Sequence, residues 1–140
     1  MVGSALNIER PGSRDVAPLR VAVVGTGGRG APERTAVRAA DYGARAYTSI
    51  DGMLEAEHPD LVTVSLPNEQ HFAPTMQLVR AGVPLLVEKP LVFDLGEADQ
   101  LLAAAGEQFV AINFNHRYAE PVLRAREALA AGELGEVVFA

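Results

Sequence analysis

Four short aliphatic runs recur along this chain, separated by longer segments in which apolar residues are spaced differently. The runs are LRVAVVG (19–25), LVTVSLP (61–67), PLLVEK (84–89) and FVAINF (109–114). Each is rich in valine, leucine or isoleucine, is too short for a buried helix, and ends in glycine, proline or polar residues. This pattern is typical of strands that are buried on both faces of a sheet.

The segments between these runs have helical spacing. In HFAPTMQLVRAG, for example, Phe72, Met76 and Val79 fall on one face. Helices are expected over 32–43, 51–58, 71–82, 94–105 and 121–132. Weaker strands are expected at ARAYTS (44–49) and EVVFA (136–140). Strands that alternate with helices of this length predict an α/β fold with a parallel sheet covered on both faces, whose ligands bind at the carboxyl ends of the strands.

Length and composition narrow the possible functions. A chain of 140 residues can form one domain with a core and is too short for two ordinary ones. Its net charge of -6 argues against binding to nucleic acid or to an acidic membrane, and no apolar run approaches the length that spans a bilayer. Without cysteine the chain has no disulfide or thiolate metal site, which suits a cytoplasmic location. Its three histidines lack ligand-like spacing, so no metal site is predicted.

The sequence GTGGRG follows the first strand and precedes the first helix. It has the G-x-G-x-x-G spacing of dinucleotide-binding loops, in which Gly25 allows a tight turn, Gly27 allows close approach to a pyrophosphate and Gly30 allows close helix packing. The free N–H groups of the following helix would then face the phosphates. Gly28 and Arg29 complete the loop, and Arg29 either adds positive charge near a phosphate or is simply a solvated arginine. A plain strand-to-helix turn is the alternative interpretation of the whole loop.

Four motifs in a fixed order resemble the N-terminal half of the Gfo/Idh/MocA family. These are VAVVGTGGRG, LVTVSLPNEQH, LLVEKPL and NFNHRY, and the pairing of Pro-Asn-x-x-His with a later Glu-Lys-Pro is specific. The family comprises NAD(P)-dependent oxidoreductases related to glucose–fructose oxidoreductase and inositol dehydrogenase. The resemblance implies a Rossmann-like, doubly wound parallel sheet over 19–118 that binds NAD or NADP. Residues 1–18 would be a flexible leader, and 119–140 a linker helix and the first strand of a substrate domain that is otherwise absent.

The chain departs from the family pattern just after the glycine loop. The loop runs directly into PERTAVRAADYG, so alignment with the family predicts that one of its β-α units is missing here. Asp51 lies 21 residues after Gly30, where a dinucleotide fold places the acid that binds the adenosine ribose. Alignment with the family instead makes Asp51 the N-cap of a short helix. A third arrangement is that ARAYTS pairs beside the first strand through a right-handed crossover, which would bring Asp51 near the ribose.

The Glu-Lys-Pro motif supplies the candidate catalytic group. By the resemblance, Lys89 lies beside the nicotinamide and the reacting carbon, and a cation there would stabilise the alkoxide that develops as hydride leaves. The resemblance also implies that Glu88 orients the strand end or the cofactor and that Pro90 follows a cis peptide bond. An ordinary ion pair at the strand end is the alternative interpretation of Glu88 and Lys89.

Two further motifs add candidate contacts to the cofactor. By the resemblance, Pro67, Asn68 and His71 contact its nicotinamide half, although His71 would equally suit the start of a helix. Arg117 matches a family arginine near cofactor and substrate, and His116 is an accessory residue.

These features predict the cofactor-binding part of an oxidoreductase that transfers hydride between nicotinamide and a CH–OH carbon of a sugar, polyol or derivative. The resemblance places a second catalytic histidine and most substrate contacts in the absent domain, so we expect this chain to be catalytically incomplete alone. No oligomer is predicted, because relatives associate through the sheet of that domain. A non-catalytic dinucleotide-binding module and an inactive partial gene product are the alternatives.

Overall fold

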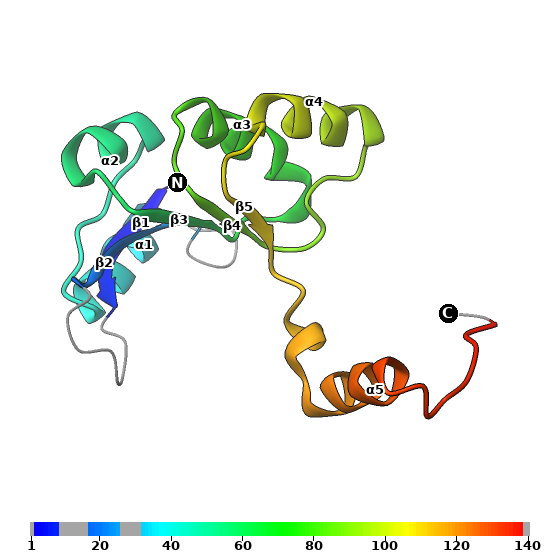
Figure 1. Cartoon of the computed structure of the whole chain (residues 1–140). Coiled ribbons are helices and arrows are strands. Elements are labelled where there is room, and N and C mark those ends of the chain that lie inside the picture. The colour runs from blue at the N-terminus through cyan, green and yellow to red at the C-terminus, as the bar shows by residue number, and fades with distance from the viewer. Residues whose placement is uncertain (1, 9–16, 26–31, 139–140) are drawn as a thin grey trace.

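A five-stranded sheet forms the centre of the structure (Figure 1). The computed structural model describes residues 2–8, 17–25 and 32–138. The strands are β1 (Val2–Ile8), β2 (Leu19–Val24), β3 (Leu61–Val64), β4 (Leu85–Val87) and β5 (Val110–Ile112), and they lie side by side in that order. Strands β2 to β5 are parallel to one another, whereas β1 runs antiparallel to β2. The four predicted strands and the parallel, Rossmann-like sheet are confirmed.

Helices cover the sheet on both sides. They are α1 (Pro32–Asp41), α2 (Ile50–Glu57), α3 (Phe72–Arg80), α4 (Leu95–Ala105) and α5 (Glu120–Ala130). Figure 1 shows α2, α3 and α4 on one face and α1 on the opposite side, where it contacts β1. Helix α5 extends away from the sheet and contacts the short 3-10 turn η2 (Asn115–Tyr118) that precedes it.

The main core lies between the sheet and α2, α3 and α4. Alternate residues of neighbouring strands face these helices, in the register Ala22 to Val62 to Leu85 and Val24 to Val64 to Val87. The helices contribute Met53, Leu78 and Leu101, which are almost completely buried. Each such aliphatic side chain stabilises the fold by roughly 1.5–3 kcal/mol relative to an exposed position. The core is therefore aliphatic, and it fixes which residues of each strand face the helices.

Three segments differ from the sequence predictions. Val2–Ile8 was expected in a flexible leader, but it forms β1 and pairs with the backbone groups on the outer edge of β2. ARAYTS was expected to be a weak strand, but it contributes only a single bridge residue, Tyr47, and its Arg45 and Tyr47 side chains contact Glu57. The described part of EVVFA (136–138) has no strand pairing, and 139–140 lie outside the described residues.

Asp51 is not the N-cap that alignment with the family implied. Ser49 is the N-cap of α2, since its hydroxyl accepts a hydrogen bond from the Gly52 N–H at 3.1 Å. Asp51 lies in the first turn, where its carboxylate accepts a hydrogen bond from the Gln77 side chain at 2.7 Å and ties α2 to α3. The arrangement with ARAYTS beside the first strand is also wrong, because β1 and β3 occupy the two edges of β2.

A buried carboxylate holds together the amino-terminal edge of the sheet. Glu57 accepts a hydrogen bond from the Arg45 guanidinium at 2.8 Å and another from the Tyr47 hydroxyl, and the Arg45 Nε lies 2.7 Å from its carboxylate in an ion pair. The Arg20 side chain donates to the Glu57 backbone carbonyl at 3.0 Å. The hydrogen bond from Arg45, followed by that from Tyr47, lowers the pKa of Glu57 below its ordinary value of 4.5.

Replacing Glu57 by Gln tests this cluster. Because the pKa of Glu57 is lower in the folded chain, its stabilisation is complete above about pH 4.5 and is lost as the pH falls through the folded-state value. We expect Glu57→Gln to lower the free energy of unfolding by roughly 1 kcal/mol near neutral pH, and by less in acid. Urea unfolding near pH 7 and near pH 3 measures both.

The matched control is Glu120→Gln, which removes an exposed ion pair with Arg124. We expect this variant to change the free energy of unfolding by less than about 0.5 kcal/mol. A loss for Glu57→Gln that is the same at both pH values would contradict the account.

Candidate active site

Most of the predicted site residues lie at one edge of the sheet. Parallel strands end at the same edge, so the residues that follow β2, β3, β4 and β5 meet there although they are far apart in sequence. The described site residues that directly follow these strands are Gly25, Pro67, Asn68, Glu88, Lys89 and Pro90. Gly27, Gly28, Arg29 and Gly30 lie outside the described residues.

Gly25 brings the turn after β2 against the loop after β3. Its φ of 101° lies in the region that favours glycine, and a Cβ there would stand 2.3 Å from the Ser65 carbonyl oxygen. The Ser65 N–H in turn donates to the Val24 carbonyl at 2.7 Å. Only glycine fits this position, so the glycine loop begins in direct contact with the neighbouring strand end.

Lys89 is exposed, and its amine has no ion-pair partner among the described residues. Its neighbour Glu88 is half-buried and accepts a hydrogen bond from the Asn113 side chain at 2.7 Å. The interpretation of Glu88 and Lys89 as an ordinary ion pair is therefore not what the structure shows. The Lys89–Pro90 peptide bond is cis, as the resemblance implied. The arrangement anchors the carboxylate and leaves the ammonium available to a ligand.

His71 is completely buried beneath this edge. Its Nδ1 lies 2.8 Å from the Pro90 carbonyl oxygen and its Nε2 lies 2.9 Å from the Leu66 carbonyl oxygen. It also occupies the N-cap position of α3, which agrees with the helix-start interpretation. Both ring nitrogens are thus engaged by backbone, and the ring offers no free nitrogen to a cofactor.

Arg117 lies further along the chain than the other site residues. It is exposed in η2, and its guanidinium lies 5.9 Å from the centre of the Tyr118 ring. His116 is exposed in the same turn.

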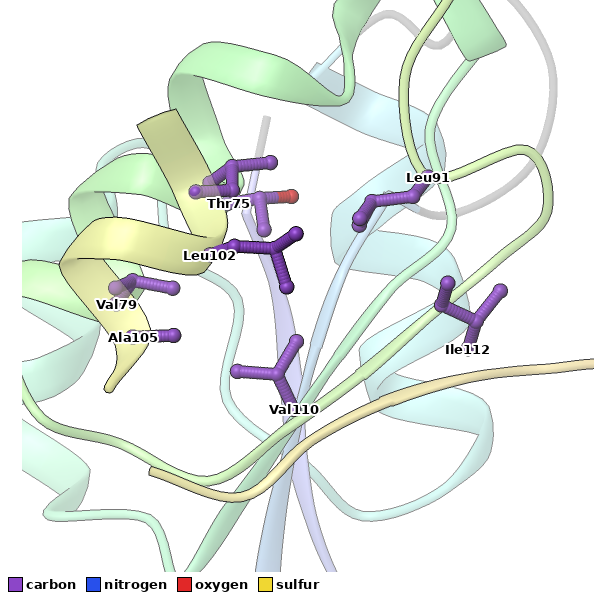
Figure 2. A pocket seen from close by; sticks show the side chains of 8 residues that line it. Thr75, Val79, Leu91, Leu102, Ala105, Val110 and Ile112 are labelled. Carbon is purple, nitrogen blue, oxygen red and sulfur yellow. The ribbon is translucent and has the colours of Figure 1, made fainter. Parts of the chain in front are cut away.

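A separate hollow lies between α3, α4 and β5 (Figure 2). It has a volume of about 100 Å³ and is lined by Thr75, Val79, Leu91, Leu101, Leu102, Ala105, Val110 and Ile112. The lining is apolar except for the hydroxyl of Thr75, which is buried and has no hydrogen-bond partner among the residues that the structure describes. Such a hollow suits neither phosphates nor sugar hydroxyls, because it supplies too few polar groups.

Two site contacts were not predicted from the sequence. The hydrogen bond between Asn113 and Glu88 joins the ends of β4 and β5, and the only signal for it was that both residues follow strands. Nothing in the sequence indicated that His71 is buried, because a histidine after Pro-Asn-x-x suits a ligand contact and a helix start equally well.

The family comparison agrees with this geometry. The family described as "Oxidoreductase family, NAD-binding Rossmann fold" (GFO_IDH_MocA) matches residues 21–116. The match covers β2 to β5 and the site residues from Gly25 to Pro90.

Individual relatives match the same part of the chain. The 1,5-anhydro-D-fructose reductase of Ensifer adhaerens is 35% identical over 111 residues, which cover 77% of this chain and 33% of the reductase. The inositol 2-dehydrogenase of Leifsonia xyli subsp. xyli is 31% identical over 109 residues, which cover 76% of this chain and 32% of the dehydrogenase.

A solved structure matches as well. GenD2 from gentamicin A biosynthesis, in complex with NAD, is 36% identical with a TM-score of 0.68, over 74% of this chain and 30% of GenD2. The chain thus spans about a third of the length of these relatives.

Replacing Gly25 by Ala tests the close approach of the first two loops. The new Cβ would overlap the Ser65 carbonyl and would also sit at a positive φ, so we expect a loss of at least about 2 kcal/mol in the free energy of unfolding. Gly43→Ala is the matched control: its φ is 63° and no atom lies within 4 Å, so it should lose only about 1 kcal/mol. Equal losses in urea unfolding would show that the contact with Ser65 is unimportant.

Replacing Thr75 by Val tests the unpartnered hydroxyl. Valine has the same shape without the hydroxyl, so we expect a free energy of unfolding that is unchanged or up to about 1 kcal/mol higher. A loss of more than about 1 kcal/mol in urea unfolding would show that the hydroxyl has a partner.

Proposed function

This chain belongs to the Gfo/Idh/MocA family of oxidoreductases, and from that membership we propose that the carboxyl edge of its sheet binds NAD. NADP is the other candidate, since β1 beside β2 is antiparallel and does not end, as the second strand of a dinucleotide fold does, where the acid that binds the adenosine ribose is expected. The residues present fit such a cofactor. Gly25 begins the glycine loop at a position where a Cβ would strike the next strand end, and Lys89 presents an unpaired cation at the same edge.

The observation that carries the proposal is the pairing of Glu88 with Asn113 rather than with Lys89. A carboxylate that is held by a neighbouring strand end does not neutralise the ammonium beside it. Lys89 is therefore available to donate hydrogen bonds to an oxygen of a ligand. In a water-poor site, such a donor stabilises the negative charge that develops on a carbinol oxygen as it is oxidised.

The nicotinamide supplies the chemistry of hydride transfer when it is bound. The roles that we assign to this chain are binding and orientation: the glycine loop for the phosphates, Pro67 and Asn68 for the nicotinamide half, Lys89 for the oxygen of the reacting carbon, and Arg117 for the substrate side. The substrate class that we propose is a sugar, a polyol or a derivative, which accords with the names of the relatives. Complete turnover would need groups from the two thirds of the relatives that this chain does not match.

We place the protein in the cytoplasm on the basis of its cysteine-free composition. Across 17–25 and 32–138, no helix has the length and apolarity needed to cross a bilayer.

Lys89 is the single lysine of the chain, and this permits a direct test. Reductive methylation with ¹³C-formaldehyde keeps the charge and labels one lysine besides the N-terminus. We expect the addition of NADH to shift the Lys89 methyl signal, and binding to enhance the fluorescence of NADH. The two titrations should give the same dissociation constant. Fluorescence binding without a shift at Lys89 would remove this residue from the site, and a folded chain that binds neither NADH nor NADPH would overturn the proposed function.

Charge removal gives a second test. We expect Lys89→Met to weaken NADH binding roughly tenfold, about 1.4 kcal/mol, because it removes an unpaired donor from the site. The matched control is Arg80→Met, since Arg80 is exposed in the last turn of α3, at the opposite edge of the sheet. If a fluorescence titration shows that both variants weaken NADH binding equally, the effect of Lys89 comes from the net charge of the chain and not from its position.

A further inference from the structure

His71 joins the two loops that carry the nicotinamide-side residues. The Leu66 carbonyl, which it contacts through Nε2, immediately precedes Pro67 and Asn68. The Pro90 carbonyl, which it contacts through Nδ1, follows Lys89. The ring therefore spans from the end of β3 to the end of β4.

These two loops have little else to hold them together. The last backbone hydrogen bond between β3 and β4 runs from the Glu88 N–H to the Val64 carbonyl, at 2.9 Å. Beyond it, the contact between His71 Nδ1 and the Pro90 carbonyl is the only hydrogen bond between 65–71 and 89–93 that the described residues make, and Nε2 ties the same ring to Leu66 within the first loop. The distance between the two loops is therefore set mainly by one side chain, that of His71.

The chemistry of the two contacts is unusual for a histidine. Both partners are backbone carbonyl oxygens, which only accept hydrogen bonds. A neutral imidazole has one N–H and one lone pair, so it satisfies one carbonyl and turns its lone pair towards the other. The ring nitrogen that carries the N–H therefore decides which of the two loops is held by a hydrogen bond.

We propose that His71 is a positioning residue, and that its contacts with the Leu66 and Pro90 carbonyls hold Asn68 and Lys89 in place for the cofactor. His71 itself touches neither cofactor nor substrate, because it is completely buried. The part of this inference that concerns the cofactor rests on the proposed function. The part that concerns the position of Lys89 does not.

Two substitutions separate the two contacts. The amide nitrogen of Asn lies as many bonds from Cα as Nδ1, and the amide nitrogen of Gln as many as Nε2. His71→Asn therefore retains a donor for the Pro90 carbonyl, and His71→Gln retains one for the Leu66 carbonyl. His71→Phe keeps a ring and removes both nitrogens.

The ¹³C-methyl signal of Lys89, measured without cofactor, reports the position of this side chain. We expect His71→Phe and His71→Gln to move the signal towards that of the urea-unfolded chain, and His71→Asn to leave it close to the wild type. We expect His71→Phe to weaken NADH binding roughly tenfold, in proportion to the loss of one well-placed hydrogen bond. If wild-type chain binds no dinucleotide, the proposed function fails, yet the Lys89 signal still tests the position.

Two controls distinguish positioning from general destabilisation. Thr75→Val alters another completely buried side chain of α3 and should leave the Lys89 signal unchanged. Glu57→Gln destabilises the opposite edge of the sheet. It is compared with His71→Phe at urea concentrations that leave the same fraction of each variant folded. Under these conditions the folded Glu57→Gln chain should bind NADH with wild-type affinity. If His71→Phe matches Glu57→Gln in both readouts, His71 is only a core histidine and the inference is overturned.

Discussion

The parallel pairing of β2 to β5 is the constraint on which the candidate site depends. Parallel strands end at one edge, so a glycine turn, an asparagine loop and a Glu-Lys-Pro turn meet there although more than sixty residues separate the first from the last. The aliphatic core below holds the strands in register, and side chains then connect their ends. Gly25 lies against Ser65, His71 joins Leu66 to Pro90, and Glu88 pairs with Asn113. The opposite edge, organised around Glu57, contributes stability and no site residue.

The outer edge of the sheet distinguishes this chain from a complete dinucleotide fold. In the six-stranded Rossmann order, a second parallel strand lies beside the first and ends in the acid that binds the adenosine ribose. Here β1 takes that place beside β2 and runs antiparallel, so it brings no carboxyl end to the site. Among the described residues, the part of the edge at the ends of β3, β4 and β5 is thus more completely built than the part beside β1. This is the physical reason why the family assignment leaves the choice between NAD and NADP open.

Much of the fold followed from the sequence, because the four aliphatic runs could only be buried strands and the spacing between them fitted helices. The errors came where pairing decides the structure. An N-terminal segment without strong hydrophobic periodicity became β1 because the edge of β2 offered it partners, and EVVFA formed no strand in its described part. Site residues were predictable as positions along the chain, since strand ends are visible in the sequence. Their roles were less so: whether a histidine after Pro-Asn-x-x faces a ligand or the protein interior depends on which carbonyls the neighbouring loop presents, and no local pattern contains that information.

The central claim is that the carboxyl edge of the parallel sheet is where dinucleotide binds. Backbone hydrogen exchange, measured with and without saturating NADH, tests it most directly because it reports every segment at once. The account predicts slower exchange at 66–70 and 88–91, with no change at Arg20 and Asp60 on the amino-terminal edge. Protection confined to the amino-terminal edge, or to the apolar hollow between α3, α4 and β5, would contradict it.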